Sequence, residues 1–586
     1  MVRNGALSPR SVRLLLAIAW AAVVLPCLPV RELMPPDEPR FGEVAREMRE
    51  GGTWVVPHLA GRVYGDKPPV LFWAVNLASF GKGDIRETTA RIPSALAALA
   101  AMLLTARLAR RLTGSAPVAL ASGLVLLTSS EFFQRAQWVS TDMLLCAFSL
   151  AAAVAWSEAL FGAPCRWMAA SEAGPVASPP PPGELTSVWA GSAPLSATAL
   201  LTLGWLAATG AVLTKGPIGL FWALAWPVAE GFARGMRGPL RRLVHPAGFV
   251  LFVVLTGGWL VAAERLSGGG FIREVLLHQS VQRYLDSWNN QQPWHFYLHQ
   301  FALDLAPWSL LFPAALVCLG RRAPERTRIA ARAIVGFLAA GGLLLSFTSG
   351  KRGVYLLPAF PASALLLTVG FFEASARGSA RRLLRNIPLV LADLLGALLA
   401  TAGFVAILRP GAGALPFGWT KLLARGEFHS AGPLLLAAGV LLCLGASTAL
   451  VLSLTERPGA SLGALACALG AVWLIAGTGG GAMATRHQGA AAFGREVASR
   501  VPENATLAIE RGKFELILFY SRRKGFQFQE PGELVRAAAA GQARFALVEE
   551  PTWRGLVEKG ETAEWRTLWQ GAMSTTDYRL IELPAR

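Results

Sequence analysis

Long apolar runs recur along the chain and constrain its fold more than any other feature of the sequence. Runs of about 18 to 22 residues are each long enough to cross a hydrocarbon core roughly 30 Å thick. Of the 586 residues, 53% are hydrophobic and only 16% are charged, which is too apolar for a soluble globule of this size. The sequence therefore predicts an α-helical polytopic membrane protein.

About thirteen such runs are predicted to be membrane spans. They cover residues 14–30, 92–108, 117–129, 142–161, 195–213, 218–232, 249–263, 303–319, 333–347, 356–372, 389–408, 434–452 and 462–477. With the N-terminus in the cytoplasm, the arginine-dense loops all fall on one side, which is the positive-inside pattern. These loops explain the formal net charge of +18, so we expect no nucleic-acid partner.

The sequence changes character near residue 484. Short β-like runs at 506–509, 516–520, 545–548 and 578–583 alternate with helical stretches and charged turns. We expect a membrane domain at 1–483, whose first loop occupies 34–90, and a small α/β domain at 484–586. An odd number of spans places this loop and the α/β domain on the same side, outside the cytoplasm.

Ionisable residues gather at the predicted outer boundary of the membrane. Groups in such positions are costly to desolvate and are therefore functional candidates. They are Asp37, Glu38, Arg40, Asp66, Lys67, Glu131, Arg135, Asp142, Lys215, Arg273, His278, Arg283, Lys351, Arg352 and Tyr355. We expect Asp37, the Asp66–Lys67 pair and the later cations to surround one cavity that opens to the lipid. Arg135 and Arg352 can also be read as interfacial span ends, and His278 as a solvated loop residue.

Several cations and a few carboxylates at a membrane edge suit a substrate that has both a phosphate and a lipid tail. Lysine and arginine neutralise phosphate oxygens and stabilise a phosphate leaving group. A carboxylate can hold a divalent cation or take a proton from an acceptor, and Asp37 is placed to act as such a base. The sequence contains no GxxxxGK[ST] loop and no dinucleotide fingerprint, so we expect no nucleotide cofactor.

Several motifs resemble those of a known enzyme superfamily. They are DEPRFGEVAREMREGGTWVVPHLAGRVYGDKPPVLFW at 37–73, RIPSALAAL at 91–99, STDMLL at 140–145, LTKGPIG at 213–219 and SGKRGVYLLPAFPA at 349–362. Over about residues 10–370 the chain resembles the GT-C glycosyltransferases. It is most similar to the 4-amino-4-deoxy-L-arabinose lipid A transferases and more distantly similar to protein mannosyltransferases.

The resemblance implies a GT-C fold and an inverting transferase at the periplasmic face of the cell inner membrane. Such an enzyme moves a pentose or hexose from a polyprenyl (undecaprenyl) phosphate donor to lipid A or another envelope glycolipid, and we expect it to be a monomer. By matching positions, Asp37 and Asp142 would be catalytic. Substrate would be bound by Arg40, Lys67, Lys215, Arg283, Lys351 and Tyr355.

The resemblance also implies a divalent metal ion held by Asp66 and His278. Relatives usually have glutamate where this chain has Asp66, and the shorter side chain changes the distance to a metal. Two other functions stay open at the level of sequence. One is a protein O-mannosyltransferase-like enzyme, and the other is a lipid or sugar transporter. A transporter should place its ionisable groups near the bilayer midplane in two repeated halves, a pattern that this sequence lacks.

Overall fold

A computed structural model of the chain describes residues 7–80, 83–162, 195–275, 291–319, 323, 325–375, 379–408 and 427–584. Ten of its helical segments are long and apolar enough to cross a membrane. Their helices are α1 (Pro9–Val24), α4 (Glu87–Thr113), α7 (Thr141–Phe161), α8 (Ala197–Lys215), α10 (Pro246–Leu266), α14 (Glu325–Ser346), α15 (Phe360–Ser375), α16 (Ser379–Leu408), α18 (Glu427–Leu454) and α19 (Pro458–Ile475). The chain is a multi-pass membrane protein.

Two further segments are bent, and one apolar helix is shorter. The first bent pair is α5 (Ala116–Leu127) and α6 (Ser130–Ala136), at 73°. The second, at 108°, joins α12 (Phe296–Asp304) to η5 (Trp308–Leu311) and α13 (Phe312–Cys318). The shorter helix is α9 (Ile218–Ala233). Each of the thirteen predicted spans therefore corresponds to a helix or a bent pair. By length and composition the described residues contain ten candidate spans, or twelve when each bent pair counts as one span, and α9 is shorter than these.

The remaining elements are short. They are η1 (Leu25–Cys27), α2 (Asp37–Glu50), β1 (His58–Leu59), β2 (Arg62–Val63), α3 (Val70–Ala78), η3 (Gly238–Leu243), η6 (Gly353–Ala359), η7 (Ala476–Gly480), α20 (Gly481–Gln488), α21 (Ala490–Arg500), β3 (Leu507–Glu510), η8 (Arg511–Lys513), α22 (Phe514–Ser521), β4 (Gly525–Phe528), α23 (Pro531–Ala539), β5 (Phe545–Glu549), α24 (Glu550–Glu558), β6 (Arg566–Met573) and β7 (Thr576–Glu582).

Contacts divide the chain into two compact units. Unit 1 consists of Met1–Cys27, Ser94–Val261 and Ile272–Gly480, and unit 2 of Leu28–Pro93, Ala262–Phe271 and Gly481–Arg586. The first-loop segment thus shares a unit with the C-terminal strands, although more than 400 residues separate Pro93 from Leu507.

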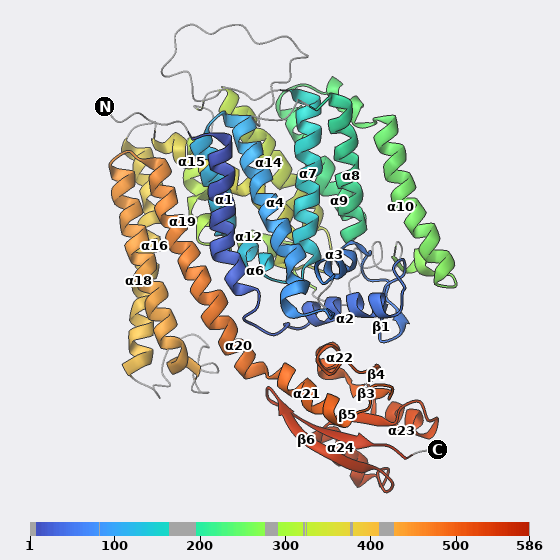
Figure 1. Cartoon of the computed structure of the whole chain (residues 1–586). Helices are drawn as coiled ribbons and strands as arrows, with labels where there is room; N and C mark the ends of the chain where they lie inside the picture. Colours follow the sequence, from blue (N-terminus) through green and yellow to red (C-terminus); the bar gives the residue numbers. More distant parts are fainter. Residues whose placement is uncertain are drawn as a thin grey trace. The chain divides into compact units, whose positions relative to one another are not determined.

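Helices α16, α18 and α19 of unit 1 pack side by side, as Figure 1 shows in yellow and orange. Glycines make the close approach of α16 and α18 possible. A Cβ atom added to Gly403 would collide with the backbone of Leu436, and one added to Gly439 would collide with the backbone of Ala400. Small residues allow helix backbones to come close in a membrane, where packing rather than water expulsion drives helix association.

A five-stranded mixed sheet forms the C-terminal part of unit 2, in the order β4-β3-β5-β7-β6. Strand β3 pairs in parallel with β4 and β5, whereas β7 is antiparallel to β5 and β6. Alternate residues of β3 point to opposite faces. Leu507 and Ile509 pack in one core with α21 and α22, and Ala508 packs in a second core with α23 and α24. The small C-terminal α/β region predicted from the sequence is confirmed.

One predicted strand in this region is wrong. Residues 516–520 belong to helix α22, in which five consecutive apolar side chains from Leu516 onward are buried or half-buried. A short apolar run of this kind has no periodicity that separates a buried helix from a buried strand. Strands β4 and β6 are additional, because their exposed and polar residues hide the alternation that marks a strand.

Candidate functional site

The structure divides the sequence-predicted site residues between the two units. Asp142, Lys215, Lys351 and Tyr355 lie in unit 1, and Asp37, Arg40, Asp66 and Lys67 lie in unit 2. His278 and Arg283 fall within 276–290, outside the described residues.

Asp142 and Lys215 of unit 1 form an ion pair in which both side chains are largely buried. Asp142 lies in the first turn of α7, and its backbone N–H donates to the hydroxyl of the capping residue Ser140 at 3.2 Å. Lys215 is the last residue of α8, which Gly216 ends with a positive φ of 79°. An acid at a helix N-terminus and a base at a C-terminus are both stabilised by the helix dipoles, so the local folds favour both charges.

Tyr355 completes this cluster. The Nζ atom of Lys215 lies 4.4 Å from the centre of the Tyr355 ring, a cation–π arrangement. Tyr355 is half-buried in η6, which follows the SGKRGVY turn. Three of the candidate residues, far apart in the sequence, therefore meet in unit 1.

Lys351 is buried, with 4% of its surface exposed. Its ammonium group donates to the backbone carbonyl of Gln292 at 2.9 Å and to that of Thr348. No carboxylate of the described residues lies within ion-pair distance of Lys351. Burial lowers the pKa of Lys351. Because carbonyls orient the ammonium without neutralising it, its charge is available to an anionic ligand.

Tyr297 on α12 is a neighbour of the unit 1 cluster that the sequence analysis missed. Its hydroxyl donates to the backbone carbonyl of Arg352 at 3.4 Å, and the ring is 5% exposed. The residue interacts electrostatically with Tyr355 and Asp142. Its sequence neighbourhood is rich in aromatic residues and gave no signal that separated this tyrosine from ordinary span-end aromatics.

Asp37 of unit 2 is the first residue of α2, and it is half-buried. Arg40, one turn later, donates from Nε to Oε1 of Glu515 at 3.0 Å. Burial alone would lower the pKa of Arg40, but Tyr64, Glu515 and Asp37 outweigh this effect and raise it. Arg40 and Asp37 thus interact electrostatically.

Tyr64 links this group to Asp66. The Tyr64 side chain is buried, and burial together with the negative charge of Asp66 raises the pKa of its phenol, while Arg40 opposes the shift. The Lys67 ammonium donates to the backbone carbonyl of Asp66 at 3.0 Å. Tyr64 stands two positions before Asp66 in VYGDKPP, and this proximity was the available signal for it.

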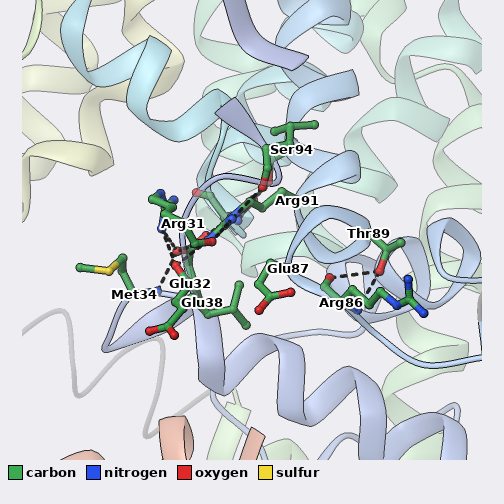
Figure 2. A network of polar contacts seen from close by, with 12 residues as sticks. Arg31, Glu32, Met34, Glu38, Arg86, Glu87, Thr89, Arg91 and Ser94 are labelled. Carbon is green, nitrogen blue, oxygen red and sulfur yellow. Dashed lines mark hydrogen bonds and ion pairs between the residues drawn. The ribbon is translucent and has the colours of Figure 1, made fainter. Parts of the chain in front are cut away.

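Glu38, the second carboxylate of the DE motif, is part of a closed network (Figure 2). Its side chain is 0% exposed and forms ion pairs with Arg31 and Arg91. It also accepts from the backbone N–H of Met34 at 2.9 Å. Burial alone would raise the pKa of Glu38, but Arg91 and Arg31 outweigh burial and hold it below its usual range. All of these partners belong to the protein, so Glu38 has a structural role.

Arg91 uses all five of its N–H donors in this network. Two bonds, of 3.0 and 3.2 Å, reach the Glu38 carboxylate. The other three reach the backbone carbonyls of Leu28, Arg31 and Glu32 at 2.7–2.9 Å. Arg91 therefore fixes the segment that leads into α2, and with it the first turn that contains Asp37.

Glu32 joins this segment to the C-terminal part of unit 2. Its carboxylate accepts from the backbone N–H groups of Ala490 and Ala491 at 2.9 and 2.8 Å, at the start of α21. A carboxylate at a helix N-terminus satisfies donors that the helix leaves unpaired. The Tyr520 hydroxyl of α22 accepts from the N–H of Leu33 at 2.8 Å. Unit 2 is thus held together by buried polar contacts.

The predicted metal ligands do not form a complete set in the part of the chain that the structure describes. Within it, no three His, Cys, Asp or Glu side chains come together in an arrangement that would hold a metal ion. Asp66 is half-buried, and its predicted partner His278 lies outside the described residues. The metal site therefore stays a prediction.

Comparisons with known proteins agree with the motifs. Residues 66–173 match the family model described as dolichyl-phosphate-mannose-protein mannosyltransferase. An undecaprenyl phosphate-α-4-amino-4-deoxy-L-arabinose arabinosyl transferase of Edwardsiella ictaluri is 28% identical over 67% of this chain and 64% of its own length. The protein of the same name in Pseudomonas aeruginosa strain LESB58 is 29% identical over 73% of this chain and 71% of its own. The chain thus spans about two thirds of the length of these relatives.

The crystal structure of ArnT from Cupriavidus metallidurans bound to undecaprenyl phosphate superposes with a TM-score of 0.75 at 19% sequence identity. The match covers 98% of this chain and 97% of that protein. At this identity the likeness establishes the fold. The resemblance predicted from the sequence is therefore confirmed: residues 66–173 match the model of the dolichyl-phosphate-mannose-protein mannosyltransferase family, and the chain has the GT-C fold seen in ArnT.

Proposed function

We propose that this protein is an inverting glycosyltransferase that uses a polyprenyl phosphate sugar as its donor. The observation that carries the proposal is the buried ammonium group of Lys351, which no carboxylate of the described residues neutralises, in a chain with the ArnT fold. An uncompensated buried cation in a membrane protein is costly unless an anionic ligand uses it. The names of the relatives point to an undecaprenyl phosphate-linked aminoarabinose.

The reaction requires charge stabilisation on a departing phosphate. The acceptor oxygen attacks the anomeric carbon, the bond from that carbon to the phosphate oxygen breaks, and polyprenyl phosphate leaves with the bonding electrons. Lys351, Lys67 and Arg283 are proposed to stabilise this leaving group, because cations placed where negative charge develops lower the barrier. Lys215 and Tyr355 are proposed to bind substrate beside Asp142, with which Lys215 forms an ion pair.

The acceptor hydroxyl must lose a proton as it attacks. Asp37 is proposed to take this proton, because it is half-buried at the first residue of α2 and interacts with Arg40 one turn later. Arg40 is held by Glu515 at 3.0 Å and is proposed to keep Asp37 ionised before the reaction. Asp66 and His278 are the residues that would hold a divalent metal. Such an ion would supply further positive charge to the donor phosphate.

The arginine distribution supports a location in the cell inner membrane with Asp37 and the α/β region on the periplasmic side. Lipid-linked donors suit that side, where nucleotide sugars are absent. For the acceptor we propose lipid A or another envelope glycolipid, following the names of the relatives. The mannosyltransferase description of the family model favours one second candidate, a protein O-mannosyltransferase-like activity.

Mass spectrometry of cells with and without this gene tests the proposal and separates the two acceptors. A pentose mass that disappears from the lipid A fraction on deletion, and returns with the wild-type gene but not with Asp37→Asn, supports the glycolipid acceptor. A sugar mass lost from envelope proteins instead supports the second candidate. Unchanged lipid and protein glycosylation would overturn both.

A further inference from the structure

A cavity of about 460 Å³ lies within unit 2. Asp37, Tyr64 and Asp66 are not among the residues that line it. Its walls come from α2, from the start of α4 and the segment before it, from α21 and the turn that follows it, and from the end of α22 and the residues that follow it. Its charged lining residues are Arg46, Asp84, Arg86, Glu87, Arg495, Glu503, Arg522 and Arg523. Five of these eight are arginines, which gives the cavity an excess of positive charge.

Two of the three carboxylates that line the cavity already have partners within the protein. Asp84 lies 2.6 Å from Arg522 and 3.6 Å from Arg49. Glu87 accepts a hydrogen bond from the Tyr520 hydroxyl at 3.0 Å. Arg46 is also paired, because its guanidinium group donates two hydrogen bonds to the Glu43 carboxylate.

Three lining guanidinium groups remain without a carboxylate partner among the described residues. Arg523 is oriented by the backbone carbonyls of Val501 and Ala498, at 2.7 and 2.6 Å, which do not neutralise it. The exposed side chains of Arg86 and Arg495 make no ion pair with any described residue. The cavity therefore has uncompensated cations, and Glu503 is the carboxylate that competes with an incoming anion.

We propose that this cavity binds a phosphate group, with Arg86, Arg495 and Arg523 as its cations. Guanidinium groups bind phosphate through paired N–H donors, and several of them match a group that has up to two charges and three acceptor oxygens. Arg523 is preorganised by its carbonyl contacts, which reduces the entropy lost on binding. The volume exceeds the needs of a bare phosphate and admits a substituent, such as the headgroup of an anionic lipid.

This site does not depend on the glycosyltransferase reaction, because none of its cations belongs to the proposed catalytic set. Loss of phosphate binding would leave the proposed function standing, and loss of transfer activity would leave this site standing. The two proposals are tested by separate measurements.

The test uses the full-length protein in detergent, titrated with inorganic phosphate in a calorimeter. A second arm uses nanodiscs that contain either phosphatidic acid in phosphatidylcholine or phosphatidylcholine alone. The variants are R86A/R495A, E503Q and, as a matched control, R536A, which removes an exposed arginine of α23 that does not line the cavity. Thermal unfolding of each variant confirms that it is folded.

We expect R86A/R495A to weaken binding by about tenfold or more, as the loss of charge-assisted hydrogen bonds predicts. E503Q should strengthen binding, and R536A should leave it unchanged. Binding of inorganic phosphate would show that a free phosphate group suffices, whereas binding seen with phosphatidic acid alone would assign a lipid headgroup. Failure of both probes, or equal binding by the wild type, R86A/R495A and R536A, would overturn the proposal.

Discussion

Lys215 at the end of α8 forms an ion pair with Asp142 at the start of α7, although 73 positions separate them in the sequence. Both residues stand at span ends that the sequence assigned to one membrane boundary. The pair therefore shows that these two helix ends lie together. It also fixes Lys215 against the ring of Tyr355.

The Asp142–Lys215 pair should stabilise the fold of unit 1. Lys215→Met leaves a largely buried carboxylate without its partner and should lower the free energy of unfolding by about 3 kcal/mol. The double variant Asp142→Asn with Lys215→Met should recover part of this loss. Thermal unfolding in detergent is measured for the wild type, for each single variant and for the double variant. Strictly additive effects of the two substitutions would contradict the coupling.

Lys351→Met should reduce the transfer rate by about 10² or more, because it removes a charge proposed to stabilise the leaving phosphate. Transfer from a radiolabelled polyprenyl phosphate sugar in proteoliposomes gives the measurement. Lys559→Met, which changes an exposed lysine of unit 2, is the matched control. Near wild-type turnover of a folded Lys351→Met protein would exclude this role.

Substitutions of the two carboxylates of the DE motif should have different effects on activity and on stability. Asp37→Asn should abolish transfer with no large change in stability, because Asp37 is half-buried at a helix start. Glu38→Gln should instead lower the free energy of unfolding by about 3–5 kcal/mol, because Arg31 and Arg91 would be left buried without their anion. Activity assays and thermal unfolding of both variants test this. A Glu38→Gln variant as stable as the wild type would contradict the structural role of Glu38.

Glu43 should make the stability of unit 2 depend on pH. Burial raises its pKa from 4.5 to about 7, although Arg46 opposes the shift. Folded Glu43 therefore keeps its proton at a pH where the unfolded chain has lost it. Its contribution to stability should fall as pH rises from about 4.5 to 7 and then become constant.

The Tm difference between the wild type and Glu43→Gln, measured between pH 4.5 and 8, isolates this effect. We expect the wild type to lose stability relative to the variant as pH rises through this interval. Parallel pH profiles would show that Glu43 has the same pKa in both states.

The helices could be predicted well from the sequence because the thickness of the hydrocarbon core requires long apolar runs, and single polar residues do not obscure runs of that length. Even the bent pairs and the shorter α9 appear as apolar runs. By contrast, residues 516–520 were assigned to a strand, because a short buried run fits either structure. Residues 28–93 and 481–586 belong to one unit because of contacts such as those between Glu32 and α21. These contacts join distant parts of the sequence, so no local sequence pattern predicts them.

The sequence could predict which charged residues stand at span ends, but it could not predict which partners surround each of them. Asp142, Lys215 and Tyr355 were found and do meet. Glu38 was a candidate for chemistry, yet the structure encloses it between two arginines. Tyr64 was missed because a tyrosine beside acidic residues is unremarkable until burial brings them together.

All five N–H donors of Arg91 are used, and this limits which residues can replace it at position 91. A lysine at position 91 would keep the charge but offers three N–H donors from one atom, which cannot reach a carboxylate and three separate carbonyls together. Positions 38 and 91 should therefore change together or not at all in homologous chains. A homologue that has lost only one of them must hold its α2 helix by another route.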